Sequence, residues 1–306
     1  MVPTKNEICD AAYSSLDQCK PLWSNLTEDG LVTRFIESEK RIGLIHHYKS
    51  FSDIGREIIE SVRVKYGEDA LRPFMRIVLL KAVIGLVNGD EIASLPRIVA
   101  SDQRRHLLRI ALDSDTSSDW LNISHDLFHK EFGLASLRLF AAGAQLIDVR
   151  CGVPRSMLFK NGLWGLPNLA YAFARLGGFK PYFEIHTHIF NLERFNEEGW
   201  ADCYRACAAL YDVFPRSLGM FGASWFYDPA IEQISPRLSY LRKTPLAGKA
   251  MILYCDTGES AKANALSTSS SRRALYEAGK YTPKNYMLIW GKSDQIAWSR
   301  SHSGIA

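Results

Sequence analysis

The sequence lacks the short motifs that identify several large enzyme classes. It has no GxxxxGK[ST] loop, no GxGxxG after an expected strand, no GxSxG turn and no HExxH helix. P-loop nucleotide hydrolases, dinucleotide-binding dehydrogenases, α/β-hydrolases and HExxH metallopeptidases are therefore disfavoured. No internal repeat or low-complexity tract stands out either, which argues against a solenoid architecture.

Cysteine is scarce, with six residues in 306 and no CxxC pair, so the pattern is typical of reduced thiols. Cys203 and Cys207 lie four residues apart on an expected helix, where core packing is favoured over metal binding. The N-terminus has no apolar signal-peptide core, and the most apolar stretch, residues 74–87, is interrupted by Arg76 and Lys81. We therefore expect a cytoplasmic protein without a membrane partner.

The charge excess is small, because 37 basic against 33 acidic residues give a formal net charge of +4. This balance disfavours a dedicated nucleic-acid binder. However, residues 235–300 contain eleven Lys or Arg and four Asp or Glu, so this segment carries +7 and leaves −3 for the remainder. A basic C-terminal quarter suits a phosphorylated ligand, and a solvated basic surface is the alternative.

Apolar periodicity changes near residue 133. Apolar residues up to about 130 recur at helical spacing, whereas from about 134 short apolar runs alternate with amphipathic stretches. The pattern predicts a mixed α+β protein of the α/β class, in which a helical region (1–133) precedes a mixed sheet with helices on both faces (134–306). The two regions can also form one compact unit.

Local signals predict the elements of the second region. Hairpins are expected from residues 137–149 with 156–159 and, at the end of the chain, from 286–290 with 295–298. Strands are expected at 182–190, 218–226 and 250–255. Helices are expected at 167–176, 229–242 and 261–278, and Asn196 is expected to cap another that runs to about Phe214.

The segment from Tyr182 to Phe190 is the most informative for chemistry. Alternate residues of a strand share a face, so Glu184, His186 and His188 are expected on one side. Three titratable groups in a row predict a strand that lines a cleft, because a strand covered on both faces is continuously apolar. A solvent-facing edge strand is the alternative.

A metal site is a second possibility for the histidines. His125 and His129 lie at i and i+4 of an expected helix and so project from one face. Together with His186 and His188 they offer four imidazole ligands for zinc or iron. A pair of surface histidines on a helix is the alternative.

The segment from Phe221 to Pro229 ends an expected strand in aromatic and acidic residues. Ligands of open α/β sheets bind just beyond the carboxyl ends of strands, where Trp225, Tyr227 and Asp228 would lie. Asp228 is a candidate base, and capping of the next helix is the alternative. Ser235 and Arg237 begin a second helix near the same edge.

A hydroxyl-rich stretch from Ser267 to Arg273 is a candidate phosphate site. Hydroxyls and backbone N–H groups at a helix start, with Ser271, Arg272 and Arg273 in the first turns, can hold a phosphate. A serine-rich N-cap on a basic helix has the same composition without a ligand.

Three phrases carry a family resemblance: EIHTHIFNLERFNEEGW, FGASWFYDPAIEQISPRLSYLR and SSSRRALYEAGKYTPKNYMLIW. They resemble a group of uncharacterised bacterial proteins. The helix after a central strand and the late RRALYEAGKY helix are also similar to the GNAT acyltransferase superfamily, which implies an acyl-CoA or aminoacyl-tRNA donor. The R/Q-x-x-G-x-G/A loop of that superfamily would follow Phe190, where this chain has NLERFN.

Three functions remain open from the sequence. The first is an acyl- or aminoacyl-transferase in which Glu184, His186 or His188 is the base and Tyr227 protonates the leaving group. In it, the basic segment holds a phosphate-bearing donor, and the acceptor is a small amine or alcohol. The second is an iron or zinc enzyme built on the histidines, with Asp228 or Glu184 as a further ligand. The third is a non-catalytic binding module whose N-terminal helices contact a partner.

Overall fold

The computed structural model describes residues 1–19, 30–42, 47–160 and 176–302, together with residues 166, 167, 170 and 174. The chain divides into two compact units. Unit 1 comprises Met1–Arg150 and Thr187–Leu192, and unit 2 comprises Cys151–His186 and Glu193–Ala306. The β1–β2 hairpin and the 187–192 segment thus group with the helices, whereas the sequence suggested a division near residue 133.

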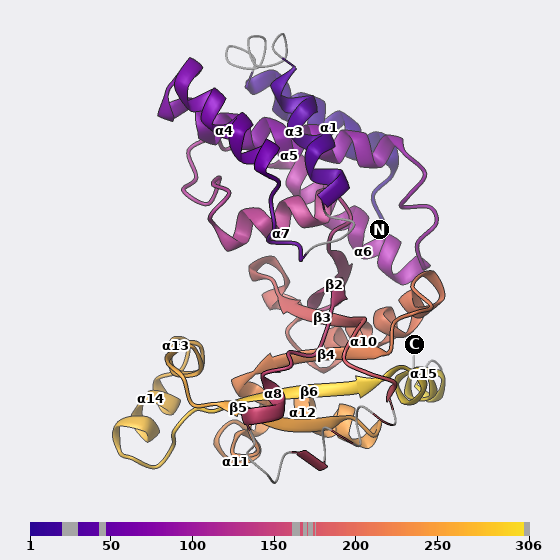
Figure 1. Cartoon of the computed structure of the whole chain (residues 1–306), viewed down its shortest axis with the longest axis vertical. Helices are drawn as coiled ribbons and strands as arrows, with labels where there is room; N and C mark the ends of the chain where they lie inside the picture. Colours follow the sequence, from indigo (N-terminus) through magenta and orange to yellow (C-terminus); the bar gives the residue numbers. More distant parts are fainter. Residues whose placement is uncertain are drawn as a thin grey trace. The chain divides into compact units, whose positions relative to one another are not determined.

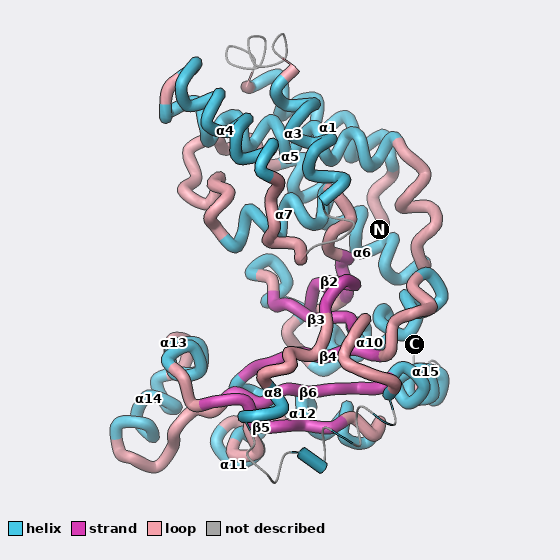
Figure 2. The backbone as a smooth tube through the Cα atoms, in the orientation of Figure 1, coloured by secondary structure: helices cyan, strands magenta, loops and turns pink. Residues whose placement is uncertain are grey.

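Unit 1 is mostly helical, as the apolar periodicity predicted (Figure 2). Its described α-helices are α1 (Lys5–Gln18), α3 (Leu31–Ile42), α4 (Asp53–Tyr66), α5 (Leu71–Asn88), α6 (Arg97–Leu112) and α7 (Asp126–Ala135), with the 3-10 turn η1 (Glu68–Ala70). Helix α5 is apolar on nearly every side and contacts α1, α3, α6 and α7. Its buried Arg76 is paired with Asp113 at 2.8 Å and stacks over Trp120, so the charge is compatible with the core.

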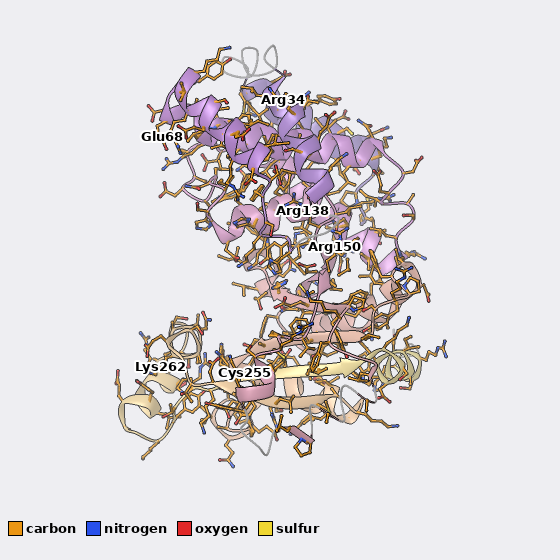
Figure 3. All side chains as sticks on the ribbon, viewed as in Figure 1. Arg34, Glu68, Arg138, Arg150, Cys255 and Lys262 are labelled. Carbon is orange, nitrogen blue, oxygen red and sulfur yellow. The ribbon has the colours of Figure 1, made fainter. Side chains whose placement is uncertain are left out.

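A short antiparallel hairpin completes unit 1. Strand β1 (Phe140–Ala142) pairs with β2 (Gln145–Cys151) through a two-residue turn, in which Gly143 has a φ of 54°. Just before β1, the buried Arg138 (labelled in Figure 3) pairs with Glu39 of α3 at 2.8 Å. The hairpin predicted between residues 137–149 and 156–159 is therefore wrong. The two strands of the observed hairpin both lie between residues 140 and 151, and residues 157–160 form helix α8 (Met157–Lys160).

Unit 2 is built on a mixed sheet, and the predicted fold class is confirmed. Its strands are β3 (Tyr182–Thr187), β4 (Gly219–Ser224), β5 (Met251–Asp256) and β6 (Asn285–Gly291), in the order β3-β4-β6-β5 (Figure 1). Strands β3 and β4 are parallel, and β6 is antiparallel to both β4 and β5. Helix α10 (Glu197–Val213) connects β3 to β4, because two consecutive parallel strands need a long crossover connection, which is usually a helix.

Helices cover both faces of this sheet. On one face, Tyr204 of α10, Trp298 of α15 (Lys292–Ser301) and Trp290 of β6 form an aromatic cluster with ring centroids 5.1–5.7 Å apart. On the other face, Met157 of α8 packs in a core with Tyr182, Phe221 and further strand residues. The predicted closing hairpin is wrong, because residues 292–301 are helical.

Two of the predicted helices of unit 2 are each divided. The first becomes α11 (Ile231–Ile234), η4 (Pro236–Leu238) and α12 (Tyr240–Ala247), and the second becomes α13 (Glu259–Leu266) and α14 (Ser270–Glu277). Pro236 explains the first division, since a proline disfavours a helical residue before it. Ser269 caps α14 and so begins a new helix. The helix expected at 167–176 lies largely outside the described residues.

No described helix combines the length and the apolar character that crossing a bilayer would require.

Candidate functional site

Glu184 and His186 alternate along β3 as the period-two pattern predicted. His186 Nε2 lies 3.8 Å from Glu184 Oε2, and both side chains are partly exposed. Both residues belong to unit 2. Of the three titratable residues expected on one face of this strand, they are the two that lie within β3.

His188 lies beyond the end of β3, so the strand predicted for residues 182–190 ends earlier than expected. The residue precedes the 3-10 turn η2 (Ile189–Arg194), belongs to unit 1 and is fully buried. Its Nδ1 accepts the backbone N–H of Phe190 at 3.3 Å, and its Nε2 lies 2.9 Å from Glu131 Oε1. This assigns the proton to Nε2 and leaves neither ring nitrogen with a lone pair for a substrate.

Glu131 of α7 is the centre of a buried network that the sequence reading missed. Arg109 Nη2 donates to both of its oxygens, at 2.8 and 2.7 Å, and the guanidinium lies over the ring of Phe190. Burial raises the pKa of Glu131, but the hydrogen bond from His188 and the charge of Arg109 outweigh it and lower the pKa. His106, edge-on to His188, has its pKa lowered to about 3 by burial and then by Arg109.

His125 and His129 do not project from one helical face. His125 is the N-cap of α7, and its Nδ1 accepts the N–H of Leu127 at 3.1 Å. His129 is buried against Phe51, and burial together with Lys49 lowers its pKa to about 4. Within the described part of unit 1, these two residues and His188 do not form a metal-ligand set.

Strands β3 and β4 pair only over a short stretch. The pairs are Phe183 with Met220 and Glu184 with Phe221, although both strands continue for three more residues. Beyond this point the parallel ladder ends. A Cβ atom on Gly222, the next residue of β4, would lie 2.6 Å from Ile185 Cγ1 and 3.6 Å from the hydroxyl of Tyr227. The Tyr227 hydroxyl is therefore adjacent to the end of the ladder.

Tyr227 lies in the 3-10 turn η3 (Trp225–Tyr227), directly after β4, and is almost completely buried. Its hydroxyl has no hydrogen-bond partner among the described residues, and the same is true of Tyr204 on α10. Burial raises the pKa of both phenols well above 10, so both remain neutral donors at physiological pH. Buried hydroxyls without partners are costly, so this position is suited to a polar group that is not part of the chain.

Asp228 follows η3 and is 4% exposed. Its Oδ1 accepts the N–H of Ala230 at 3.0 Å in a turn before α11, whose N-cap is Ala230, so Asp228 is not itself the helix cap that was the alternative. Its Oδ2 is buried without a partner among the described residues, as is the hydroxyl of Tyr281. Burial raises the pKa of Asp228, whereas Lys284 and Arg242 oppose the shift.

The structure brings Trp225, Ser235 and Arg272 together from three separate segments. The Arg272 guanidinium lies 4.4 Å from the centre of the Trp225 ring, and its Nη1 donates to Ser235 Oγ at 3.3 Å. Nε donates to the Ala265 carbonyl at 2.6 Å and Nη2 to Thr268 Oγ1 at 3.3 Å. Ala265 lies in α13, Thr268 between α13 and α14, and Arg272 in α14. Figure 3 labels Cys255 of β5 and Lys262 of α13, the helix that follows this strand.

The remaining predicted donor residues are on the surface. Ser271, Arg273 and Arg237 are exposed, although the charge of Arg237 acts on Arg272. Of the two adjacent arginines of α14, only Arg272 is therefore buried. The sequence did not distinguish them, because both stand in the same polar run.

No protein-family model matches this chain, and neither a curated protein nor a solved structure is significantly similar to it.

Proposed function

We propose that this protein is an acyl- or aminoacyl-transferase. It would transfer an acyl group from a phosphate-bearing donor, an acyl-CoA or an aminoacyl-tRNA, to an amine or hydroxyl of a small molecule. The observation that carries the proposal is the buried, unpartnered hydroxyl of Tyr227 beside the end of the β3–β4 ladder.

The end of the ladder supports a donor with an amide-containing arm. Past Glu184 and Phe221 the facing backbone groups of β3 and β4 no longer pair with each other. An extended chain that carries amides can bind to such groups in the way that a peptide adds to a strand. The pantetheine arm of an acyl-CoA has this chemistry.

In the proposed reaction, donor and acceptor bind on the face of β3 and β4 where the Tyr227 hydroxyl lies. The acceptor's lone pair attacks the acyl carbonyl carbon, the new C–N or C–O bond forms, and the C–S or C–O bond to the donor breaks. Glu184 and His186 point to the face of β3 opposite to Ile185, and so away from the Tyr227 hydroxyl, so the acceptor's proton passes to solvent water. The neutral Tyr227 hydroxyl donates a hydrogen bond to the leaving atom, so a thiolate leaves as an anion, whereas the more basic alkoxide of a tRNA ribose takes the proton.

The N-terminus of α10 is a poor site for the donor's phosphates. Asn196 already caps this helix by accepting the N–H of Gly199 at 2.9 Å, and Glu197 and Glu198 occupy its first turn. Two carboxylates at a helix start repel an anion. This agrees with the absence of the superfamily's phosphate loop and favours a phosphate site elsewhere in unit 2.

The test is a donor screen with the purified full chain and its Tyr227→Phe variant. Acyl-CoAs of several chain lengths and charged tRNAs are incubated with an amine panel, and release of thiol or tRNA is followed with product mass. We expect transfer from one donor class and a loss of about a hundredfold in the variant. Tyr227→Phe removes an unpartnered hydroxyl, so its stability should not fall.

Tyr211→Phe is the matched control, because the Tyr211 hydroxyl donates to Gln295 Oε1 at 2.5 Å in the same core. This variant should lose stability and keep its activity. A transfer activity that Tyr227→Phe leaves intact, or the absence of transfer from every donor, would refute the proposal.

A further inference from the structure

Arg272 is a buried cation without a carboxylate partner. The residue is 3% exposed, and no Asp or Glu among the described residues lies within ion-pair distance of it. Its hydrogen-bond acceptors are one carbonyl and two hydroxyls, all neutral. A buried charge is normally paired, because its desolvation is costly, so this guanidinium is suited to an anion that is not part of the chain.

The guanidinium has donors to spare. Of its five N–H groups, three are used by Ala265, Ser235 and Thr268, which leaves one on each terminal nitrogen. N–H groups of a guanidinium can bind the oxygens of a phosphate. The Trp225 ring lies against the guanidinium, with 4.4 Å between the guanidinium carbon and the ring centre, which favours the cation at this position.

Tyr281 and Asp228 contribute two further buried polar atoms that have no hydrogen-bond partner among the described residues. Tyr281, 5% exposed, has a free hydroxyl that lies within electrostatic range of both Arg272 and Asp228. Asp228 adds the buried Oδ2 described above, and the backbone N–H of Lys284 lies close to this carboxylate. The site therefore offers donors for an anion and, beside them, an acceptor for a hydroxyl or N–H.

The surrounding charges favour an anion. The charged groups that act on Asp228 and Arg272 are Arg237, Arg242 and Lys284, and Arg242 also pairs with Glu232 at 3.2 Å. With Arg272, four cations stand against two carboxylates, an excess of two. Oxygen ligands alone would suit a metal cation, but the excess of positive charge around the site opposes a cation.

We propose that Arg272, Tyr281 and Asp228 form a binding site for a ribonucleotide phosphate: Arg272 and Tyr281 bind the phosphate oxygens, and Asp228 accepts a hydrogen bond from a ribose hydroxyl. The site deepens the proposed transferase, because it would hold the nucleotide end of the donor. Binding at the site does not itself depend on transfer activity.

The test measures binding to the full chain by calorimetry and by the change in tryptophan fluorescence. The probes are adenosine 3′,5′-bisphosphate, adenosine and inorganic phosphate. We expect the bisphosphate to bind at least about tenfold more tightly than either of the others, since both parts of the site are then used. Equal binding of bisphosphate and inorganic phosphate would refute the ribose contact, and no binding at millimolar concentration would refute the site.

Arg272→Gln and Arg273→Gln form a matched pair on adjacent positions of α14. The first should weaken bisphosphate binding by about tenfold or more, and the second should leave it nearly unchanged, because Arg273 is exposed. Equal losses in both variants would indicate a general basic surface and overturn the proposal. If Arg272→Gln fails to fold, Arg272→Lys replaces it in the test. This variant keeps the charge but removes the planar guanidinium, so it should bind the bisphosphate with intermediate affinity.

The outcomes separate the two proposals. Bisphosphate binding that depends on Arg272, combined with no transfer in the donor screen, would refute the transferase and leave the nucleotide site intact. Transfer that depends on Tyr227, combined with unchanged donor binding in Arg272→Gln, would refute the nucleotide site alone.

Discussion

At the residue scale, unit 1 contains a network of charged and polar groups around the buried Glu131. The carboxylate is 0% exposed and neutralises Arg109 while contacting His188. We expect Glu131→Ala to lower the free energy of unfolding by about 1–3 kcal/mol, because it leaves the buried His188 and the partly exposed Arg109 without their hydrogen-bond partner. Urea denaturation followed by circular dichroism measures this change.

The control for that prediction is Glu57→Ala, since Glu57 is exposed on α4. Exposed carboxylates contribute little, so this variant should stay within about 0.5 kcal/mol of the parent. Similar losses from both substitutions would contradict the importance of the buried network.

His106 predicts a dependence of stability on pH. Its pKa is about 3 in the folded chain and about 6.5 when unfolded, so between these values the unfolded state binds more protons. Stability must therefore fall as the pH decreases below 6.5. From pH 7 to pH 5 this residue alone should cost about 2 kcal/mol.

The measurement is urea denaturation of the parent and His106→Gln at both pH values. The variant should show a smaller loss on acidification, whatever its absolute stability, and its remaining loss includes that of the buried His129. His302→Gln, at an exposed position, should keep the loss of the parent. An identical loss in parent and His106→Gln would show that His106 is not buried in its neutral form.

The site residues differ in how far the sequence could predict them. Glu184 and His186 followed from the two-residue period of a strand, which is a local property. Arg272 and Arg273 have the same local signal, and their difference arises from Ser235 and Trp225, which are distant in sequence. Glu131 had no local signal, because its partners Arg109 and His188 come from other segments.

At the element scale, two glycines predict opposite effects of the same substitution. A Cβ atom on Gly219 of β4 would lie 2.2 Å from the carbonyl oxygen of Trp290, so Gly219→Ala should lower stability by about 1–3 kcal/mol. A Cβ atom on Gly85 of α5 meets nothing within 4 Å, so Gly85→Ala should raise stability by about 0.5–1 kcal/mol. Thermal melts of the two variants beside the parent measure both effects, and a destabilised Gly85→Ala would contradict the open space at α5.

Element prediction succeeded where the signal was local. Asn196 caps α10 as expected, and β5 lies within one residue of its predicted bounds. It failed at residues 292–301, where an apolar stretch after β6 suggested a second strand. The buried Gln295 and Trp298 are three residues apart, a helical spacing, and α10 covers them.

At the scale of the whole molecule, each unit has its own hydrophobic core. We therefore expect Glu131→Ala to accelerate amide hydrogen exchange in α6 and α7 more than in β4 and β6. Gly219→Ala should have the reverse effect, because local opening follows the stability of the surrounding core. Exchange followed by mass spectrometry tests this, and uniform acceleration by either variant would show that the chain opens as one unit.

The sequence by itself determined the class of the fold: a helical first part, alternating strands and helices after it, and several helix caps. These features depend on the periodicity and chemistry of neighbouring residues. Only the tertiary structure decided that His188 is held by Glu131 and that Arg272, not Arg273, is buried. Such choices depend on which distant groups share a desolvated space, and the energy of a charge there depends on neighbours that no local pattern specifies.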